Sequence, residues 1–214
     1  FGDMHHLALA AQAQHAAGNA NQIEAVLANP RISGYCITQL NDVSWEFHAG
    51  LLDLWRHPKL AYFASQRLNQ PQVVILHAAR TVVTPGERLR LTLTQVNRAP
   101  LPANAEIELT LLDPVGVSSA LGRRPAAGRE GIHELGEFVA ATASQPGRYE
   151  VRARLWVGEG ILAETQQALL ALAPAPNLAE LAAAQTWLGE RPAWLTPQAA
   201  NQAPGGVLVV ARPG

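Results

Sequence analysis

Polar side chains able to do chemistry follow an apolar run near the start of the 214-residue chain. The run ISGYCITQL, residues 32–40, leads directly into NDVSWEF, residues 41–47. This polar tip brings together the carboxylates of Asp42 and Glu46 and the indole of Trp45. Carboxylates act as general acids, general bases or nucleophiles, and an indole packs against the flat faces of ligands. The tip is therefore a candidate site for acid–base chemistry or for ligand binding.

Two interpretations of this tip are open from the local pattern. If residues 32–40 form a buried strand, the side chains just beyond its C-terminal end line an active site, as they do in α/β barrels. Alternatively, Asn41 and Asp42 only cap the turn that follows the strand. Asp42 and Glu46 are four residues apart on a loop, and nothing in the pattern sets them on two sides of a substrate. We do not assign them as a catalytic pair.

The histidines and the cysteine do not extend this chemistry. No spacing repeats the i, i+4 histidine pair with a nearby carboxylate that a zinc helix uses, and no glycine-rich stretch has the lysine of a phosphate loop. Cys36 is the only cysteine, so no intrachain disulfide is possible, and we predict that it is a small buried core residue. We expect neither a metal nor a cofactor. The histidines, predicted to lie at the surface or at caps, are His5, His6, His15, His48, His57, His77 and His133.

Composition narrows the class of protein. The chain is 48% hydrophobic and 15% charged, with a net charge of -1, which is typical of a globular protein and gives no electrostatic basis for binding nucleic acid or an acidic membrane. No apolar run approaches the length of a membrane span. The tightest basic pair, Arg123 and Arg124, is predicted to be a solvated loop tip beside Pro125.

The first thirty residues predict two short helices. Residues 3–17 place apolar side chains on one helical face, and Gly18 is a predicted stop. Asn21 and Glu24 resemble a capping box at the start of a second helix, which Pro30 ends.

A strand and a third helix are expected next. Residues 32–40 are predicted to be the strand, and Pro58 lies near the start of the helix. Helix–strand alternation is typical of a parallel sheet with covering helices, but one strand cannot make a sheet. The apolar face predicted for the third helix consists of Leu60, Phe63, Ala64 and Leu68.

Residues 71–173 have a different pattern, with six or seven short and mostly alternating segments separated by turn signals. This pattern predicts an immunoglobulin-like antiparallel β-sandwich, so the fold class is mainly β with an α-rich N-terminal segment. The segment AETQQALLAL contains helix formers, yet we predict the closing strand there because Gly158–Gly160 reads as a hairpin turn. Residues predicted to face inward are Leu89, Leu91, Leu93, Ile107, Leu109, Leu111, Tyr149, Val151, Ala153 and Leu155.

Residues 174–214 form the third predicted part of the chain. NLAELAAAQTWLGE predicts a helix, and Val207–Val210 predicts a buried strand after a proline-punctuated loop. This part is either the opening of a further domain or a strand that docks on the sandwich.

The first seventy residues resemble part of a known enzyme family. ISGYCITQLNDVSWEFHAGLLDLWRHPKLAYFASQRL is similar to the last strand, loop and helix of the catalytic barrel of glycoside hydrolase family 2, which includes β-galactosidases, β-glucuronidases and β-mannosidases. The strand-rich region that follows also fits, because sandwiches accompany the barrel in that family. The residues that carry the resemblance are Gly34, Gln39, Asp42, Gly50, Leu51, Leu52, Asp53, Arg56, Pro58 and Lys59.

The resemblance implies a function for the whole protein. It implies that residues 1–70 are the end of a (β/α)8 barrel, and that the chain begins just after the nucleophilic glutamate, which often precedes a Phe-Gly pair such as Phe1-Gly2. The acid/base glutamate would also lie upstream. Retaining glycosidases need two carboxylates about 5 Å apart. We therefore expect a β-glycoside to be the substrate of the parent protein and this fragment to be inactive alone.

The resemblance also implies which residues contact the sugar. Thr38, Gln39 and Asp42 occupy positions that line the sugar pocket, and Trp45 is placed to stack on a sugar ring; no catalytic residue is assigned. The alternative is a non-catalytic sandwich module that binds carbohydrate or a protein partner. Its strands offer few aromatics for a sugar platform, since Trp156 is predicted to be core.

Residues 1–70 are expected to need a partner. A strand whose backbone groups lack neighbours on both edges is unfavourable, and so is an exposed apolar helix face. We expect residues 32–40 to pair with another copy of the chain, giving a homo-oligomer, or to pack against a surface other than a barrel.

Overall fold

The computed structural model describes residues 3–44, 46, 49–141 and 145–172. Contacts divide the chain into two compact units, Phe1–Ala173 and Pro174–Gly214. The second unit lies outside the described residues, and so do the helix and the strand predicted within it. The side chains of Leu89, Ala140 and Ala141 are also outside the description.

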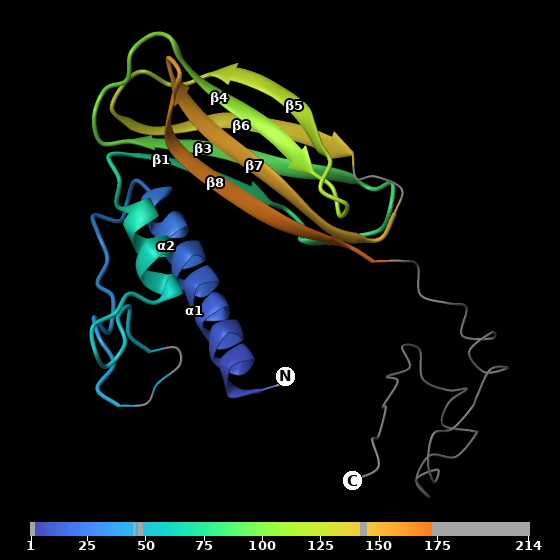
Figure 1. Cartoon of the computed structure of the whole chain (residues 1–214). Coiled ribbons are helices and arrows are strands. Elements are labelled where there is room, and N and C mark those ends of the chain that lie inside the picture. The colour runs from blue at the N-terminus through green and yellow to red at the C-terminus, as the bar shows by residue number, and fades with distance from the viewer. Residues whose placement is uncertain (1–2, 45, 47–48, 142–144, 173–214) are drawn as a thin grey trace, which may run out of the picture. The chain divides into compact units, whose positions relative to one another are not determined.

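The described part is mainly β with helices at its N-terminus (Figure 1). Neither helix is long and apolar enough to cross a bilayer, as far as the described residues show. The elements are α1 (Met4–Leu27), α2 (Leu60–Leu68), β1 (Gln72–Ala78), β2 (Val82–Val83), β3 (Arg88–Asn97), β4 (Ala105–Leu112), β5 (Ser118–Pro125), β6 (Gly131–Ala141), β7 (Gly147–Val157) and β8 (Gly160–Ala171).

The strands form two sheets. One has the order β1-β3-β6 and the other the order β2-β8-β7-β4-β5. Every pairing is antiparallel except that of β2 with β8. The chain crosses between the two sheets several times, after β1, β2, β3, β5 and β6, as expected of the predicted immunoglobulin-like sandwich. The hydroxyl of Tyr149, near the start of β7, donates to the carbonyl of Gln145 at 2.9 Å, which is the tyrosine corner of such sandwiches.

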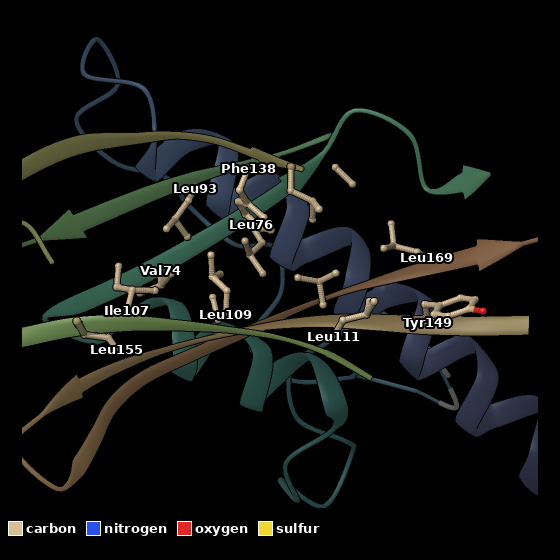
Figure 2. Close-up of a cluster of buried hydrophobic side chains, with 14 of the residues drawn as sticks. Val74, Leu76, Leu93, Ile107, Leu109, Leu111, Phe138, Tyr149, Leu155 and Leu169 are labelled. Atoms are coloured by element: carbon tan, nitrogen blue, oxygen red, sulfur yellow. The ribbon is translucent and has the colours of Figure 1, made fainter. Parts of the chain in front are cut away.

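The two sheets share one apolar core (Figure 2). Leu91 and Leu93 of β3 face the row Ile107, Leu109 and Leu111 of β4, and all five are buried. The inward prediction is confirmed for every described member of the set. Arg90 and Thr92 are exposed, so the predicted register is correct. Alternation of apolar and polar residues therefore encodes this face directly.

The predicted closing strand, β8, forms although its sequence is rich in helix-forming residues. β8 pairs with β7 along its whole length after a turn at Gly158 and Glu159, and Gly158 has a φ of 61°. Leu169 and Ala171 enter the core. Tertiary burial of one face thus overrides the helix propensity of AETQQALLAL, and the strand prediction is confirmed.

The basic pair does not lie on a loop tip. Arg123 and Arg124 are part of β5. Arg124 donates to the carbonyls of Leu135 and Glu137 on β6, at 2.8 and 3.0 Å, and its guanidinium lies over the ring of Phe138. The prediction of a loop tip was wrong because both arginines pair with β4 as part of the sheet. The side chain of Arg124 also joins the edge strand β5 of one sheet to the edge strand β6 of the other.

The N-terminal residues form one helix instead of two. Asp3 caps α1 by accepting from the backbone N–H of His6, and the helix runs through Gly18 to Leu27. Glycine in a helix costs only about 1 kcal/mol relative to alanine, so Gly18 does not end it, and Asn21 is not a cap.

The helices and the strand β1 share a second apolar cluster. Ile23 of α1 and Leu68 of α2 pack with Val73 and Ile75 of β1. Because Val74 and Leu76 face the sandwich core, β1 is buried on both faces. On α2 the buried face is Ala61, Ser65 and Leu68, while Leu60 and Phe63 of the predicted face are exposed.

Residues 32–40 pack against this cluster without forming the predicted strand. Tyr35 and Ile37 are partly buried against the cluster, so this segment is in contact with the helices and β1. Cys36 alternates outward and is exposed, which corrects the prediction of a buried core residue. A strand requires hydrogen-bonding neighbours, and this segment has no ladder partner among the described residues.

Candidate functional site

The polar tip belongs to a loop that returns on itself between Gln39 and Lys59. The amide of Leu52 donates to the carbonyl of Leu40 at 2.9 Å, and the amide of Asp42 donates to the carbonyl of Leu52 at 3.0 Å. The amide of Lys59 donates to the carbonyl of Leu51 at 2.9 Å. Three short stretches of chain are thereby held side by side. We call residues 39–59 the tip loop.

A buried ion pair lies at the centre of the tip loop. The Nζ of Lys59 lies 3.0 and 2.8 Å from the two carboxylate oxygens of Asp42. Asp42 is 2% exposed and Lys59 is 5% exposed. Breaking such a pair is costly because the remaining charge stays buried without compensation. The pair therefore fixes the tip to the segment that precedes α2.

Gly50 completes the environment of Asp42. Its N–H donates to Oδ1 of Asp42 at 2.6 Å. A Cβ at Gly50 would lie 2.6 Å from the backbone nitrogen of Asp42 and 2.7 Å from the carbonyl carbon of Asn41. Only glycine allows the two backbones to approach this closely.

Asp53 shapes the turn before Pro58. Its carboxylate accepts from the backbone N–H of His57 at 2.8 Å and contacts the His57 ring at 3.1 Å. Desolvation opposes the charged form of Asp53, but the hydrogen bonds from His57 outweigh it and lower the pKa of the carboxyl. Arg56 within this turn has a φ of 69°. The turn thus brings the following lysine back toward Asp42.

Several residues quoted for the family pattern shape the tip loop. Gly50 permits the close approach, Leu51 is buried, and Lys59 neutralises Asp42. The ion pair itself was not predicted from the sequence. One signal was present, since Lys59 is the only lysine in the chain and a single lysine among fifteen arginines invites a specific role.

The predicted sugar contacts fall in different environments. Thr38 is exposed and Gln39 is half-buried, and a cis peptide bond joins them. The Nε2 of Gln39 donates to Oε2 of Glu46 at 2.9 Å. Both oxygens of Asp42 are occupied by Lys59, so this carboxylate acts within the fold. Trp45 lies outside the described residues.

Large apolar side chains of the tip loop and of the first turn of α2 are exposed. Val43 is 75% exposed and Leu40 is 60% exposed. We call the following set the apolar rim: Leu40, Val43, Leu54, Leu60 and Phe63.

We next consider the side chains that could bind a metal ion. Within the described ranges, no group of three or more His, Cys, Asp or Glu side chains is placed to hold a metal ion. His57 is engaged with Asp53, and His133 contacts the carbonyl of Arg129 at 2.9 Å.

Comparison with known proteins gives only distant structural similarity. No protein-family model matches the chain, and no curated protein is significantly similar to it.

Solved structures align with about half of the chain. A cycloisomaltooligosaccharide glucanotransferase from Paenibacillus sp. aligns with 45% of the chain at 14% identity and a TM-score of 0.33. A β-glucosidase from Listeria innocua aligns with 47% of the chain at 15% identity and a TM-score of 0.35. The chain spans 13% and 16% of those two proteins. The sporulation control protein Spo0M from Bacillus subtilis aligns with 50% of the chain, at 12% identity, a TM-score of 0.32 and half of its own length. Similarity at this level identifies neither a family nor an activity.

Proposed function

We propose that this chain is a non-catalytic C-terminal part of a retaining β-glycoside hydrolase. In this proposal residues 1–70 complete a (β/α)8 barrel, and the immunoglobulin-like sandwich is the accessory domain attached to it. The observation that carries the proposal is the tip loop. Three residues of the pattern quoted for glycoside hydrolase family 2, namely Asp42, Gly50 and Lys59, together close the loop around one buried ion pair.

The acidic side chains of the tip loop support a non-catalytic role. Asp42 is held by Lys59, Glu46 accepts from Gln39, and Asp53 is bound by His57. A retaining glycosidase needs one carboxylate free to attack the anomeric carbon and a second to protonate the leaving oxygen, about 5 Å apart. We therefore assign the chemistry to carboxylates supplied by another part of the parent protein.

The same geometry divides the predicted sugar contacts by role. Asp42 positions the tip through its ion pair, whereas Thr38 and Gln39 retain accessible surface for ligand hydroxyl groups. Gln39 is already oriented by Glu46, which lowers the entropy lost when an amide binds a sugar. Trp45 stays a predicted stacking residue.

The apolar rim is the surface that such a barrel would cover. Leu40, Val43 and Leu54 project from the tip loop, and Leu60 and Phe63 from the first turn of α2. In a complete (β/α)8 barrel, the last strand and helix pack against the preceding strand–helix unit. They also pack against the first strand–helix unit, which closes the barrel. The same surface supports self-association when this chain is studied alone, through residues 1–70.

The activity test has two arms. The 214-residue chain should not turn over nitrophenyl β-glycosides. The full open reading frame that contains it should hydrolyse a β-glycoside with retention, and Gln39→Ala there should lower kcat/KM about tenfold or more. Gln66→Ala, at an exposed position on α2, is the matched control.

Three results contradict the proposal. The first is turnover by the 214-residue chain that Asp42→Asn or Glu46→Gln abolishes. The second is a full-length product with no glycosidase activity. The third is a full-length product in which Gln39→Ala and Gln66→Ala behave alike.

A separate measurement tests self-association. Light scattering of the 214-residue chain should give the mass of a dimer or larger, and the double variant Val43→Ser/Phe63→Ser should shift it toward the monomer. A monomeric wild-type chain at high concentration contradicts the oligomer.

A further inference from the structure

The outer face of the five-stranded sheet carries an aromatic side chain that sequence analysis assigned to the core. In β7, Val151, Ala153 and Leu155 point inward and are fully buried. Trp156 is the next residue, so it points outward and is half-buried. The prediction of a core position was wrong because side chains alternate along β7, and Trp156 lies between Leu155 and Val157, which both pack on the core side.

Charged side chains on neighbouring strands form an ordered row beside Trp156. The β-ladder sets Arg123 opposite Glu108, Glu108 opposite Arg154, and Arg154 opposite Glu164. Arg123 binds Glu108 at 3.0 Å, and Arg154 binds Glu164. Charges thus alternate across four strands. Opposite charges at facing positions stabilise each other, which orders these side chains.

The row fixes the indole. The Nε1 of Trp156 donates to Oε2 of Glu108 at 3.2 Å, and the other oxygen of Glu108 accepts from Arg123. The β7–β4 register is continuous through Trp156, whereas the β7–β8 register shifts beside it because Leu162 of β8 has no partner on β7.

A pocket of about 440 Å3 lies against this indole. Its size is within the range of small-ligand sites, roughly 300 to 1,000 Å3. The turn after β7 contributes to one side of it, where Gly158 leaves open space above its Cα. The lining residues are Asn104, Glu106, Arg123, Trp156, Gly158 and Glu159.

We propose that this pocket binds one or two units of a neutral saccharide, with Trp156 as the stacking surface. A sugar ring presents an apolar face to an aromatic ring and hydroxyl groups around its edge. Those hydroxyl groups need donors and acceptors together. Arg123 donates, Glu106 accepts, and the amide of Asn104 does both.

Charge in the pocket favours a neutral ligand. The lining contains two carboxylates and one guanidinium, a net of one negative charge, which repels uronic acids and phosphates. The positive charge of Arg123 repels a cationic peptide. Its guanidinium forms an ion pair with Glu108 and lies 3.5 Å from Glu106. The site shares no residue with the tip loop, so the proposal is independent of the glycosidase assignment.

Calorimetric titration of the 214-residue chain tests the proposal. The probes are linear tetrasaccharides of β-linked glucose, galactose, mannose and xylose, with a tetragalacturonide and tetralysine as charged comparisons. At least one neutral tetrasaccharide should bind. Trp156→Ala should weaken that binding about tenfold or more, and Asn104→Ala about threefold to tenfold. Gln166→Ala, on the same face outside the pocket, should leave it unchanged.

Thermal denaturation shows whether each variant folds. If Trp156→Ala unfolds the sandwich, Trp156→Phe and Asn104→Ala give the decision, because Asn104 lies outside the strands. The proposal is overturned if no neutral tetrasaccharide binds, if only tetralysine or tetragalacturonide binds, or if the folded Trp156 and Asn104 variants bind as tightly as the wild type.

Discussion

The sandwich and the helical segment before it are stabilised by different kinds of interaction. In the sandwich, long antiparallel strands share one apolar core, and the side chains alternate between core and solvent. The buried apolar residues described in residues 3–68 are Ile23, Leu51, Ala61 and Leu68, and two of them, Ile23 and Leu68, pack in the cluster with β1. The tip loop adds a buried ion pair to this segment. A region with one large core unfolds as a unit, whereas a region held by a few contacts opens locally.

This difference predicts different responses to mutation. The tip loop and the apolar rim lie in the helical segment, where local opening is expected. The sandwich provides a rigid support through β1, which is buried on both faces. Predictions that distinguish local from global unfolding therefore test the comparison directly.

The largest effect is expected for Lys59→Met. This change leaves the carboxylate of Asp42 buried without a partner, which costs about 3–5 kcal/mol. The cost should fall on the tip loop alone. Hydrogen exchange should show loss of protection at the amides of Asp42 and Leu52, with the amide of Leu91 in the sandwich unchanged.

A double variant and the single lysine provide controls for this result. Asp42→Leu/Lys59→Met replaces both charges and should restore much of the protection. Because Lys59 is the only lysine, its acylation by an amine reagent reports loop opening, and Gly50→Ala should accelerate it. Unchanged exchange in Lys59→Met would show that the ion pair does not hold the loop.

A comparable cost with a global consequence is expected for Leu91→Ala. Leu91 is fully buried between the sheets, and large-to-small changes at such positions cost about 2–5 kcal/mol. Denaturant unfolding should show this loss for the whole sandwich. The neighbouring change Thr92→Ala, on the exposed side of the strand, should cost less than about 0.5 kcal/mol. Equal costs at the two positions would contradict the face assignment.

The sandwich could be predicted from the sequence because its signals are local. Alternation in RLRLTLTQV sets the inward face of β3, and glycine-containing turns set the strand ends. Residues 32–40 gave an equally clear apolar run, but a strand depends on neighbours that the run itself does not specify. The segment packs on the second cluster through Tyr35 and Ile37 instead.

The candidate sites were predictable only in part for the same reason. The polar tip was visible as a cluster of residue types, but the partner of Asp42 is seventeen positions away. The Trp156 pocket combines residues from β4, β5, β7 and the segments before β4 and after β7, which become neighbours only through strand pairing. Sequence patterns identify faces, whereas the pairing of strands identifies sites.

A smaller difference between the regions is expected when two tyrosine hydroxyls are removed. Tyr149→Phe removes the hydrogen bond that closes the corner between β6 and β7, and should cost about 1 kcal/mol of sandwich stability. Tyr35→Phe removes a 2.7 Å bond from Asn69 at an exposed position in the helical segment. Its effect on global unfolding should be smaller, as measured by thermal denaturation. A larger loss for Tyr35→Phe would reverse the assigned order of stability.

The smallest effect distinguishes the two regions by the sign of their pH dependence. Desolvation raises the pKa of Glu24 in α1 above its ordinary value of 4.5, although Arg67 partly offsets it. The carboxyl of Glu24 therefore binds its proton more tightly in the folded state than in the unfolded state. Its contribution to stability is present at low pH and is lost as pH rises through the raised pKa. Hydrogen bonds from the backbone and hydroxyl of Thr84 and the charge of Arg80 lower the pKa of Glu87, so its contribution is lost as pH falls.

Two glutamine variants measure these opposite slopes. Unfolding free energies of the wild type, Glu24→Gln and Glu87→Gln are compared from about pH 3 to about pH 7. Relative to the wild type, Glu24→Gln should gain stability as pH rises, because it removes a carboxylate that is desolvated in the folded helix. Glu87→Gln should lose stability over the same range. Parallel profiles for the two variants would show that the carboxyl of Glu24 in α1 is as well solvated as that of Glu87 in the sandwich turn. In that case the helical segment packs less closely on β1 than the second apolar cluster indicates.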